Sequence, residues 1–164
     1  MITPVFTSKI LDPEALKTKL LSNNSSGVTV FTNGVFDVLH RGHVSYLDIA
    51  SQLGQLLVVA LNTDRSAKML GKGEERPLNT LIDRMNVIAA LESVSYVTWF
   101  DEDTPLEIIK LIRPDVIVKG GDYDMSKLPE TQFVQAYGGQ AKTINFFDGY
   151  STTALVKKIQ ATKP

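Results

Sequence analysis

Short apolar segments rich in β-branched and aromatic residues alternate along the chain with longer segments in which apolar residues recur every three or four positions. The first pattern predicts strands and the second predicts amphipathic helices. We expect five strands, at residues 28–31, 56–61, 96–100, 116–118 and 142–146. Most are apolar nearly throughout, which is typical of strands buried on both faces of a parallel sheet. The predicted fold class is therefore α/β, a Rossmann-like doubly wound sheet of five parallel strands.

Helical stripes are predicted over residues 44–53, 81–89, 106–112 and from about Thr152 to the end of the chain. Gly54 is expected to close the first of these helices as a left-handed cap. The third should stop at Arg113, because the next residue is Pro114 and the residue before a proline disfavours helical geometry.

A further short helix is predicted near the start of the chain, with Asp12 as its cap and Pro13 in its first turn, followed by a polar linker. We therefore expect a helical extension and linker over residues 1–26. One domain should then occupy residues 27–164, in line with the usual size of single domains.

Composition narrows the classes of protein that fit. Lys and Arg number 17 against 18 Asp and Glu, a net charge of −1, and this balance argues against a nucleic-acid partner. The absence of cysteine excludes disulfides, thiolate catalysis and thiolate metal sites. The chain lacks an apolar run of the roughly 20 residues that would cross a membrane, and its start does not resemble a signal peptide. We expect a cytoplasmic protein with no membrane partner.

Both histidines of the sequence lie in His40-Arg41-Gly42-His43, directly after the first predicted strand. Ligands of doubly wound sheets bind at the carboxyl ends of the strands, and a helix N-terminus there favours phosphate. Gly42 would allow close approach of a ligand or a backbone. A lone histidine would more often be a half-buried structural ring, and a metal between His40 and His43 would need carboxylates as further ligands. No Walker loop and no Gly-x-Gly-x-x-Gly follows the first strand.

These residues carry a family resemblance. Asn33-Gly34-Val35-Phe36-Asp37, followed by the two histidines, resembles the first motif of the HxGH nucleotidyltransferase superfamily, and the Ser151-Thr152-Thr153 turn before the last helix resembles its second. From residue 31 to about 159 the chain is similar to the heptose 1-phosphate adenylyltransferases of that superfamily. The matching segments are residues 76–79, 83–85, 102–105, 118–123 and 151–153.

The resemblance implies that ATP and D-glycero-β-D-manno-heptose 1-phosphate give ADP-heptose and pyrophosphate, for lipopolysaccharide core or surface-polysaccharide precursors. The residues suit such a reaction independently. A sugar phosphate is already an anionic nucleophile, so the protein need only align it with ATP and stabilise the spreading charge. We expect Mg²⁺ to enter with ATP, a separate sugar kinase to supply the sugar phosphate, and the protein to be a homodimer.

Site residues are expected in three groups, with no metal held by the protein itself. His40, His43 and Lys72 are assigned to catalysis. The nucleotide-binding group is Asn33, Gly34, Val35, Phe36, Gly42, Lys119, Gly120, Gly121, Asp122, Ser151, Thr152 and Thr153, of which residues 119–122 are placed near adenine and ribose by resemblance. The sugar-phosphate group is Asp37, Asn62, Arg76 and Arg84.

Simpler interpretations of several of these residues stay open. Ser151-Thr152-Thr153 could be a plain helix cap, and Lys72 could be solvated surface. Arg84 could pair with a carboxylate on its own helix. Asp64 could cap the helix after the second strand, and Gly120-Gly121 could form only a tight turn.

Two other functions remain possible from the sequence. The two short motifs are shared with cytidylyltransferases that use glycerol 3-phosphate or a phosphoalcohol. A nucleotide-binding module without turnover would keep the same fold.

Overall fold

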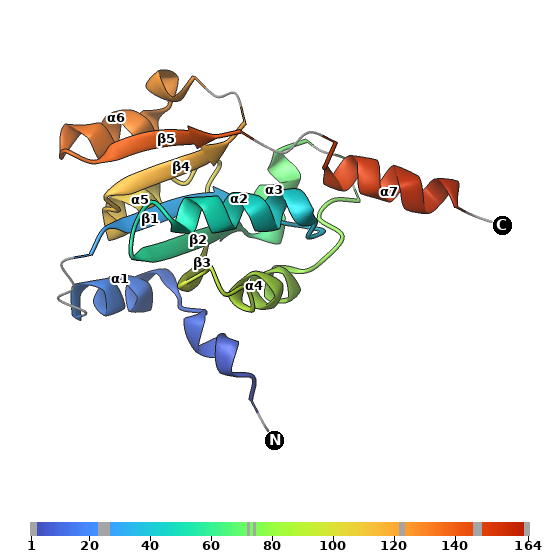
Figure 1. The fold of residues 1–164 in the computed structure, drawn as a ribbon, viewed down its shortest axis with the longest axis horizontal. Coiled ribbons are helices and arrows are strands. Elements are labelled where there is room, and N and C mark those ends of the chain that lie inside the picture. Colours follow the sequence, from blue (N-terminus) through green and yellow to red (C-terminus); the bar gives the residue numbers. More distant parts are fainter. Residues whose placement is uncertain are drawn as a thin grey trace.

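The computed structural model describes residues 3–22, 27–71, 73, 75–121, 124–145 and 149–162. Within them, five parallel strands form one sheet in the order β3-β2-β1-β4-β5 (Figure 1). The strands are β1 (Thr29–Gly34), β2 (Leu56–Asn62), β3 (Tyr96–Phe100), β4 (Val116–Gly120) and β5 (Gln140–Ile144). The predicted α/β class and the parallel pairing are confirmed.

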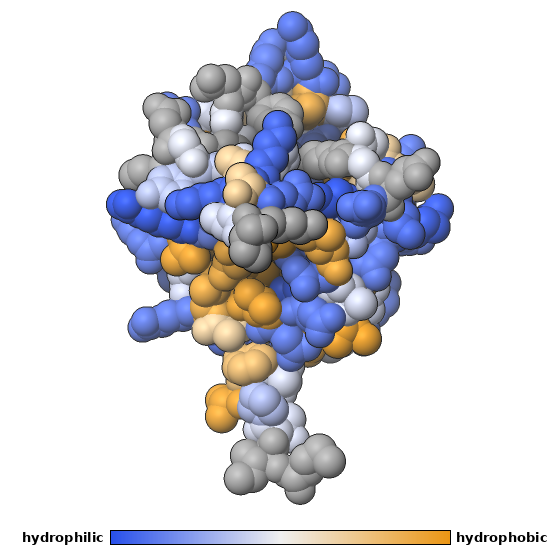
Figure 2. Space-filling model, turned by 90° about the vertical axis from the view of Figure 1, so that its right-hand side faces the viewer, coloured by the Kyte–Doolittle hydropathy of each residue, from blue (hydrophilic) through white to orange (hydrophobic). Residues whose placement is uncertain are grey.

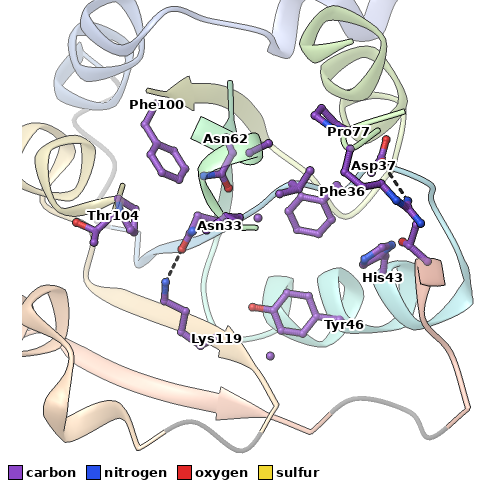
Figure 3. A pocket seen from close by; sticks show the side chains of 18 of the residues that line it. Asn33, Phe36, Asp37, His43, Tyr46, Asn62, Pro77, Phe100, Thr104 and Lys119 are labelled. Carbon is purple, nitrogen blue, oxygen red and sulfur yellow. Dashed lines mark hydrogen bonds and ion pairs between the residues drawn. The ribbon is translucent and has the colours of Figure 1, made fainter. Parts of the chain in front are cut away.

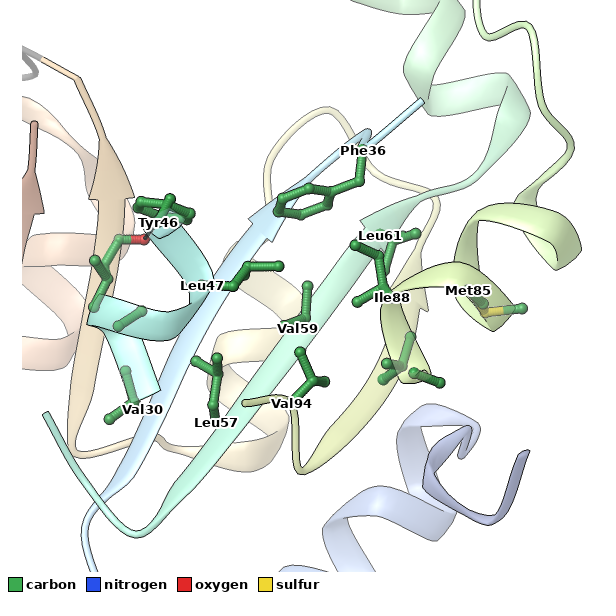
Figure 4. Packing of buried hydrophobic residues seen from close by; sticks show 14 of the residues in the cluster. Val30, Phe36, Tyr46, Leu47, Leu57, Val59, Leu61, Met85, Ile88 and Val94 are labelled. Carbon is green, nitrogen blue, oxygen red and sulfur yellow. Dashed lines mark hydrogen bonds between the residues drawn. The ribbon is translucent and has the colours of Figure 1, made fainter. Parts of the chain in front are cut away.

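Helices cover both faces of the sheet. On one face, α2 (Arg41–Ser51) and α4 (Leu81–Ala89) pack on the strands, and Figure 4 shows Leu47 and Ile88 beside Val59 and Leu61. On the other face, α1 (Pro13–Ser22), α5 (Leu106–Ile112) and α6 (Pro129–Ala136) pack on Phe31 and Ile117. The two clusters follow from the alternation of neighbouring strand residues between faces.

The remaining helices lie at the edges of this core. They are η1 (Val5–Lys9), α3 (Asp64–Met69), η2 (Met125–Lys127) and α7 (Thr152–Ala161). The last helix projects from the body of the molecule and has no buried residue (Figure 1). In the described part of the chain, none of the helices is both long enough and apolar enough to span a bilayer.

Three expectations about the elements need correction. The fifth strand is residues 140–144, not 142–146, and only Ile144 in it is buried, because β5 is an edge strand. The first strand continues to Gly34, since Asn33 and Gly34 still pair with β2. Helix α6 was not predicted, and α3 was expected only as the helix that Asp64 could cap, without bounds.

Gly54 is not the left-handed cap that the sequence suggested. Helix α2 ends at Ser51, and Gly54 is not among the residues with positive φ. A Cβ atom at Gly54 would lie 2.4 Å from the Val28 carbonyl oxygen and 2.7 Å from Cγ2 of Val30. The glycine is therefore needed for close approach of two backbone segments, not for its own conformation.

The N-terminal segment packs into the core of the domain. Asp12 caps α1 as predicted, because its Oδ1 accepts the Ala15 N–H at 2.8 Å. Leu16 is fully buried in the cluster that contains Phe31. The Leu11 N–H also donates to the Val97 carbonyl oxygen. Helix α1 thus contributes to the same core as the strands.

Replacing Leu16 by alanine should therefore lower the free energy of unfolding by about 2–5 kcal/mol, as for other buried leucines. Leu21 lies on the same helix but is 71% exposed, so Leu21→Ala is the matched control and should change stability by less than about 0.5 kcal/mol. Denaturant unfolding measures both. Equal effects of the two substitutions would show that α1 does not belong to the core.

Candidate functional site

A cavity of about 700 Å³ lies at the carboxyl ends of the strands (Figure 3). Strand order reverses between β1 and β4, and the cavity opens at that point, where doubly wound sheets bind ligands. Fourteen of the predicted site residues line it: Asn33, Gly34, Val35, Phe36, Asp37, His40, His43, Asn62, Arg76, Lys119, Gly120, Ser151, Thr152 and Thr153. Lys72 and Asp122 lie outside the described residues.

The two histidines form one stacked pair at the start of α2. Their ring centroids are 3.8 Å apart and the ring planes differ by 18°. Burial lowers the pKa of His40, which favours its neutral ring, and a neutral imidazole still has one N–H to donate. Two rings stacked at this distance would repel each other if both were cationic.

Gly42 makes the stacked arrangement possible, although it does not itself line the cavity. A Cβ at this position would lie 3.1 Å from Nδ1 and Cε1 of His40 and from Cβ of Tyr150. The expected close approach at Gly42 is thus made by two side chains of the chain itself.

Phe36 lies in the turn between β1 and α2 and contacts His43. This residue has a positive φ of 48°, which is uncommon for a residue other than glycine and clusters at functional sites. Its ring meets the ring of His43 edge-on at 5.3 Å. A Cβ at Gly34 would lie 3.0 Å from Cε2 of the Phe36 ring, so Gly34 leaves room for that ring.

Lys119 at the end of β4 bridges two polar side chains in the cavity wall. Its Nζ donates to Oδ1 of Asn33 at 2.7 Å, drawn as a dashed line in Figure 3, and pairs with Oε1 of Glu130 at 3.1 Å. Desolvation lowers the pKa of Lys119, opposed by the charge of Glu130. A lysine can only donate, so Asn33 must turn its oxygen to Lys119 and keep its NH₂ group for a ligand.

The N-terminus of α7 reaches the cavity with its three hydroxyl residues. The Ser151 Oγ accepts the Ala154 N–H at 3.0 Å, so Ser151 is a helix cap, as the simpler interpretation had it. Thr152 instead donates to the Val38 carbonyl oxygen at 3.3 Å and ties the helix to the turn after β1. The cap and the cavity wall are therefore made by the same turn.

Arg84 does not reach the cavity, contrary to its assignment to the sugar phosphate. It is 1% exposed, and its guanidinium donates to the carbonyl oxygens of Val35, Asn62 and Asn79. It also pairs with Asp64 at 2.7 Å, a carboxylate on α3 and not on its own helix. We therefore leave Arg84 out of the proposed ligand contacts.

Two further expectations are resolved by local geometry. Asp64 is the first residue of α3, and the cap is Thr63, whose Oγ1 accepts the Ser66 N–H. Gly121 has a φ of 99° and donates its N–H to Ile144, which fits the tight-turn interpretation. Gly121 does not line the cavity, whereas Gly120 does.

Several lining residues were missed by sequence reasoning. Among them are Tyr46, Phe100, Asp103, Thr104, Glu130 and Tyr150. Asp103 and Thr104 lie in a segment that carried the family resemblance, so their position after β3 was a signal that could have been used. Tyr46 and Glu130 lie inside helices, and nothing in the sequence pattern distinguishes them from ordinary helix residues.

Residues 31–158 match the family model described as cytidylyltransferase-like. The chain belongs to the cytidylyltransferase-like family of nucleotidyltransferases. Within that family it is 56% identical over 155 residues to D-beta-D-heptose 1-phosphate adenylyltransferase of Bordetella bronchiseptica, covering 94% of this chain and 96% of the relative. It is 50% identical to the bifunctional protein HldE of Marinomonas sp., covering 91% of this chain and 31% of that protein. The chain thus spans about a third of the bifunctional relatives.

Solved structures agree with the fold. A lipopolysaccharide core biosynthesis protein from Thermoplasma volcanium superposes with a TM-score of 0.63 at 27% identity, covering 77% of this chain and 100% of that one. Pantoate-beta-alanine ligase from Francisella tularensis superposes with a TM-score of 0.60 at 11% identity, covering 92% and 76%. The second likeness concerns the fold alone.

Replacing Arg84 by methionine should lower the free energy of unfolding by roughly 3 kcal/mol or more, because the buried carbonyl group of Asn62 would lose its donor and those of Val35 and Asn79 would each lose a charged hydrogen bond, at about 1–3 kcal/mol each. Arg65→Met is the matched control, since the Arg65 side chain is 66% exposed and its pair with Asp101 is on the surface. Chemical denaturation compares the two variants. A loss no larger than that of the control would contradict the structural role given to Arg84.

Proposed function

We propose that this protein transfers the adenylyl group of ATP to D-glycero-β-D-manno-heptose 1-phosphate, giving ADP-heptose and pyrophosphate. The observation that carries the proposal is the 56% identity to a heptose 1-phosphate adenylyltransferase along 94% of the chain. The cavity supports it, because the paired histidines and the N-terminus of a helix line one space at the strand ends.

In the proposed reaction an oxygen of the sugar phosphate attacks the α-phosphorus of ATP. A new P–O bond forms there, the bond from the α-phosphorus to the bridging oxygen breaks, and pyrophosphate leaves with the electron pair. The nucleophile is already ionised, so no side chain has to remove a proton from it. The task of the chain is to align the two phosphates and stabilise the charge that spreads between them.

We assign different residues of the cavity to the phosphates and to the nucleotide. His40 and His43 donate hydrogen bonds to the phosphates, with Lys72 as a further catalytic cation. Ser151, Thr152 and Thr153 bind the outer phosphates at the α7 N-terminus, where backbone N–H groups favour anions. Residues 33–36 and 119–122 bind the nucleotide, with Lys119 holding the amide of Asn33 in place.

The sugar is assigned to the side of the cavity formed by the ends of β2 and β3. Asn62 lies there, and so do Asp103 and Thr104, which are exposed and can accept hydrogen bonds from hydroxyl groups. Arg76 is placed on the sugar phosphate, because a guanidinium matches the geometry of phosphate oxygens.

Mg²⁺ is assigned to the phosphates of ATP, where it would neutralise charge and keep most of its water. Three carboxylates line the cavity among the residues that the structure describes, and those of Asp37 and Glu130 are engaged by Arg76 and Lys119. The third, Asp103, is exposed and is assigned to the sugar, so the ion would be held by ATP and water and not by the protein.

The context of the reaction is also part of the proposal. A kinase must supply the sugar 1-phosphate, and the protein is assigned to the cytoplasm, where ATP is formed. We further propose a homodimer, because η1 and α4 expose the large apolar residues Val5, Ile82 and Val87. Figure 2 shows an apolar patch toward the N-terminal side of an otherwise largely hydrophilic face.

Pyrophosphate release with matched pairs of nucleotide and acceptor tests the proposal. The kcat/KM for ATP with heptose 1-phosphate should exceed that for CTP with glycerol 3-phosphate by at least about 10³, because a small acceptor would leave polar groups of the sugar site unpaired. A preference for CTP would overturn the heptose assignment. Release with neither pair, despite nucleotide binding, would favour a binding module without turnover.

The same assay includes His43→Ala as a control for contamination. Its kcat should fall by about 10²-fold or more, as on removal of other donors that stabilise developing charge. Circular dichroism should show that this variant is folded.

A further inference from the structure

The segment that precedes α4 is held to the β1–α2 turn by one residue, Asp37, through its carboxylate and its backbone oxygen. Its Oδ2 accepts Nη1 of Arg76 at 3.0 Å and the Leu78 N–H at 2.9 Å. Its Oδ1 accepts the Asn79 N–H at 2.9 Å, and its backbone oxygen accepts Nδ2 of Asn79 at 2.6 Å. Four hydrogen bonds thus join two segments that lie about 40 positions apart in the sequence.

Three of these bonds end on the Asp37 carboxylate, and they leave it little capacity for a ligand. Its side chain is 7% exposed, and an ionised carboxylate has roughly four acceptor sites. Burial by itself would raise the pKa of Asp37, but the N–H groups of Asn79 and Leu78 and the Arg76 guanidinium outweigh it and lower the pKa. The charge of this group is committed to the protein.

Arg76 is differently placed. Its side chain is 19% exposed and lines the cavity, and only Nη1 is used for the pair with Asp37, which Figure 3 draws as a dashed line. A guanidinium has five N–H donors in a rigid plane, so an arginine held at one edge by a carboxylate can still bind phosphate oxygens with the rest.

We propose that Asp37 is a positioning residue: it holds the guanidinium of Arg76 against the cavity so that Arg76 binds a phosphate group of the substrates, and Asp37 itself does not contact substrate. This revises the assignment of Asp37 to the sugar-phosphate contacts and rests on the proposed function only in that the substrates carry phosphate. An arginine held in place loses less conformational freedom on binding. An unpaired carboxylate at this position would repel the same phosphates.

A double-mutant cycle on Asp37→Asn and Arg76→Ala tests the inference, with calorimetric binding of ATP and of inorganic pyrophosphate as readouts. The amide introduced by Asp37→Asn would place an NH₂ group against the N–H donors that the carboxylate now accepts, so Arg76 would lose its ion-pair partner. Each single substitution should raise the Kd of the ligand that Arg76 contacts by roughly tenfold or more, the size expected for a charged hydrogen bond. The double variant should bind no more weakly than Arg76→Ala alone, because Asp37 acts through Arg76.

Kinetics on the same variants assign the phosphate. If Arg76 binds the sugar phosphate and not ATP, the loss should appear in the KM for the sugar phosphate, again without addition in the double variant. Losses that multiply in the double variant for both substrates would overturn the inference, as would an Asp37→Asn variant with unchanged binding and KM. Asp48→Asn is the matched control, an exposed carboxylate on α2, and should stay within twofold of the unmodified protein.

Chemical rescue covers the case in which Asp37→Asn does not fold. Arg76→Ala keeps Asp37 intact, and millimolar guanidinium should bind that carboxylate and restore part of the lost pyrophosphate or sugar-phosphate affinity. Methylammonium at the same concentration should restore less, because it lacks the planar donor set. Absence of any rescue would count against the positioning role. Pyrophosphate binding can be measured without turnover. If the double-mutant cycle shows that Asp37 acts through Arg76 but the unmodified protein has no activity, the proposed function is refuted and this inference stands.

Discussion

The buried guanidinium of Arg84 is the interaction on which the geometry of the cavity depends. A charged group that is almost completely buried is tolerated only when its donors are satisfied. Arg84 meets this requirement with the carbonyl oxygens of Val35 at the β1 turn, Asn62 at the end of β2 and Asn79 before α4, and with the carboxylate of Asp64. Because the donors lie in a rigid plane, the positions of these chain segments are fixed relative to one another.

From Arg84 the contacts continue to the cavity wall. Asn79 accepts from Arg84 through its carbonyl oxygen and donates to Asp37 through its N–H and its side chain. Asp37 in turn holds Arg76. The opposite wall has a similar arrangement, in which Glu130 pairs with Lys119 and Lys119 orients Asn33. Arg76 and Lys119 thus each have a carboxylate partner. The placement of their N–H donors, and not an excess of positive charge, favours phosphate binding, which agrees with the net charge of −1 of the chain.

The parallel sheet could be predicted because long apolar runs such as residues 56–61 are hard to place except in buried strands. The location of the site followed from His40 and His43 after the first strand. The edge strand β5 was misplaced because its exposed residues carry no apolar pattern. Helix α6 was missed because two of its three buried residues, Glu130 and Thr131, are polar, and so it lacks an apolar stripe. The partners of Arg84 are 5 to 49 positions away in the sequence, and the role of Gly54 depends on a strand that it approaches only in the folded chain. Such contacts are set by tertiary packing and leave no local signal.

The central claim is that the triphosphate of ATP binds at the two histidines. NMR titration of their ring protons tests it most directly, since the sequence has only two histidines and His40→Gln assigns the signals. In the protein without nucleotide, the pKa of His40 should lie below its ordinary value of 6.5, because burial disfavours the charged ring. Saturating ATP should raise that pKa, because nearby phosphate charge favours the imidazolium form, whereas adenosine should leave it unchanged. A pKa of His40 that does not respond to ATP, or responds equally to adenosine, would contradict the account.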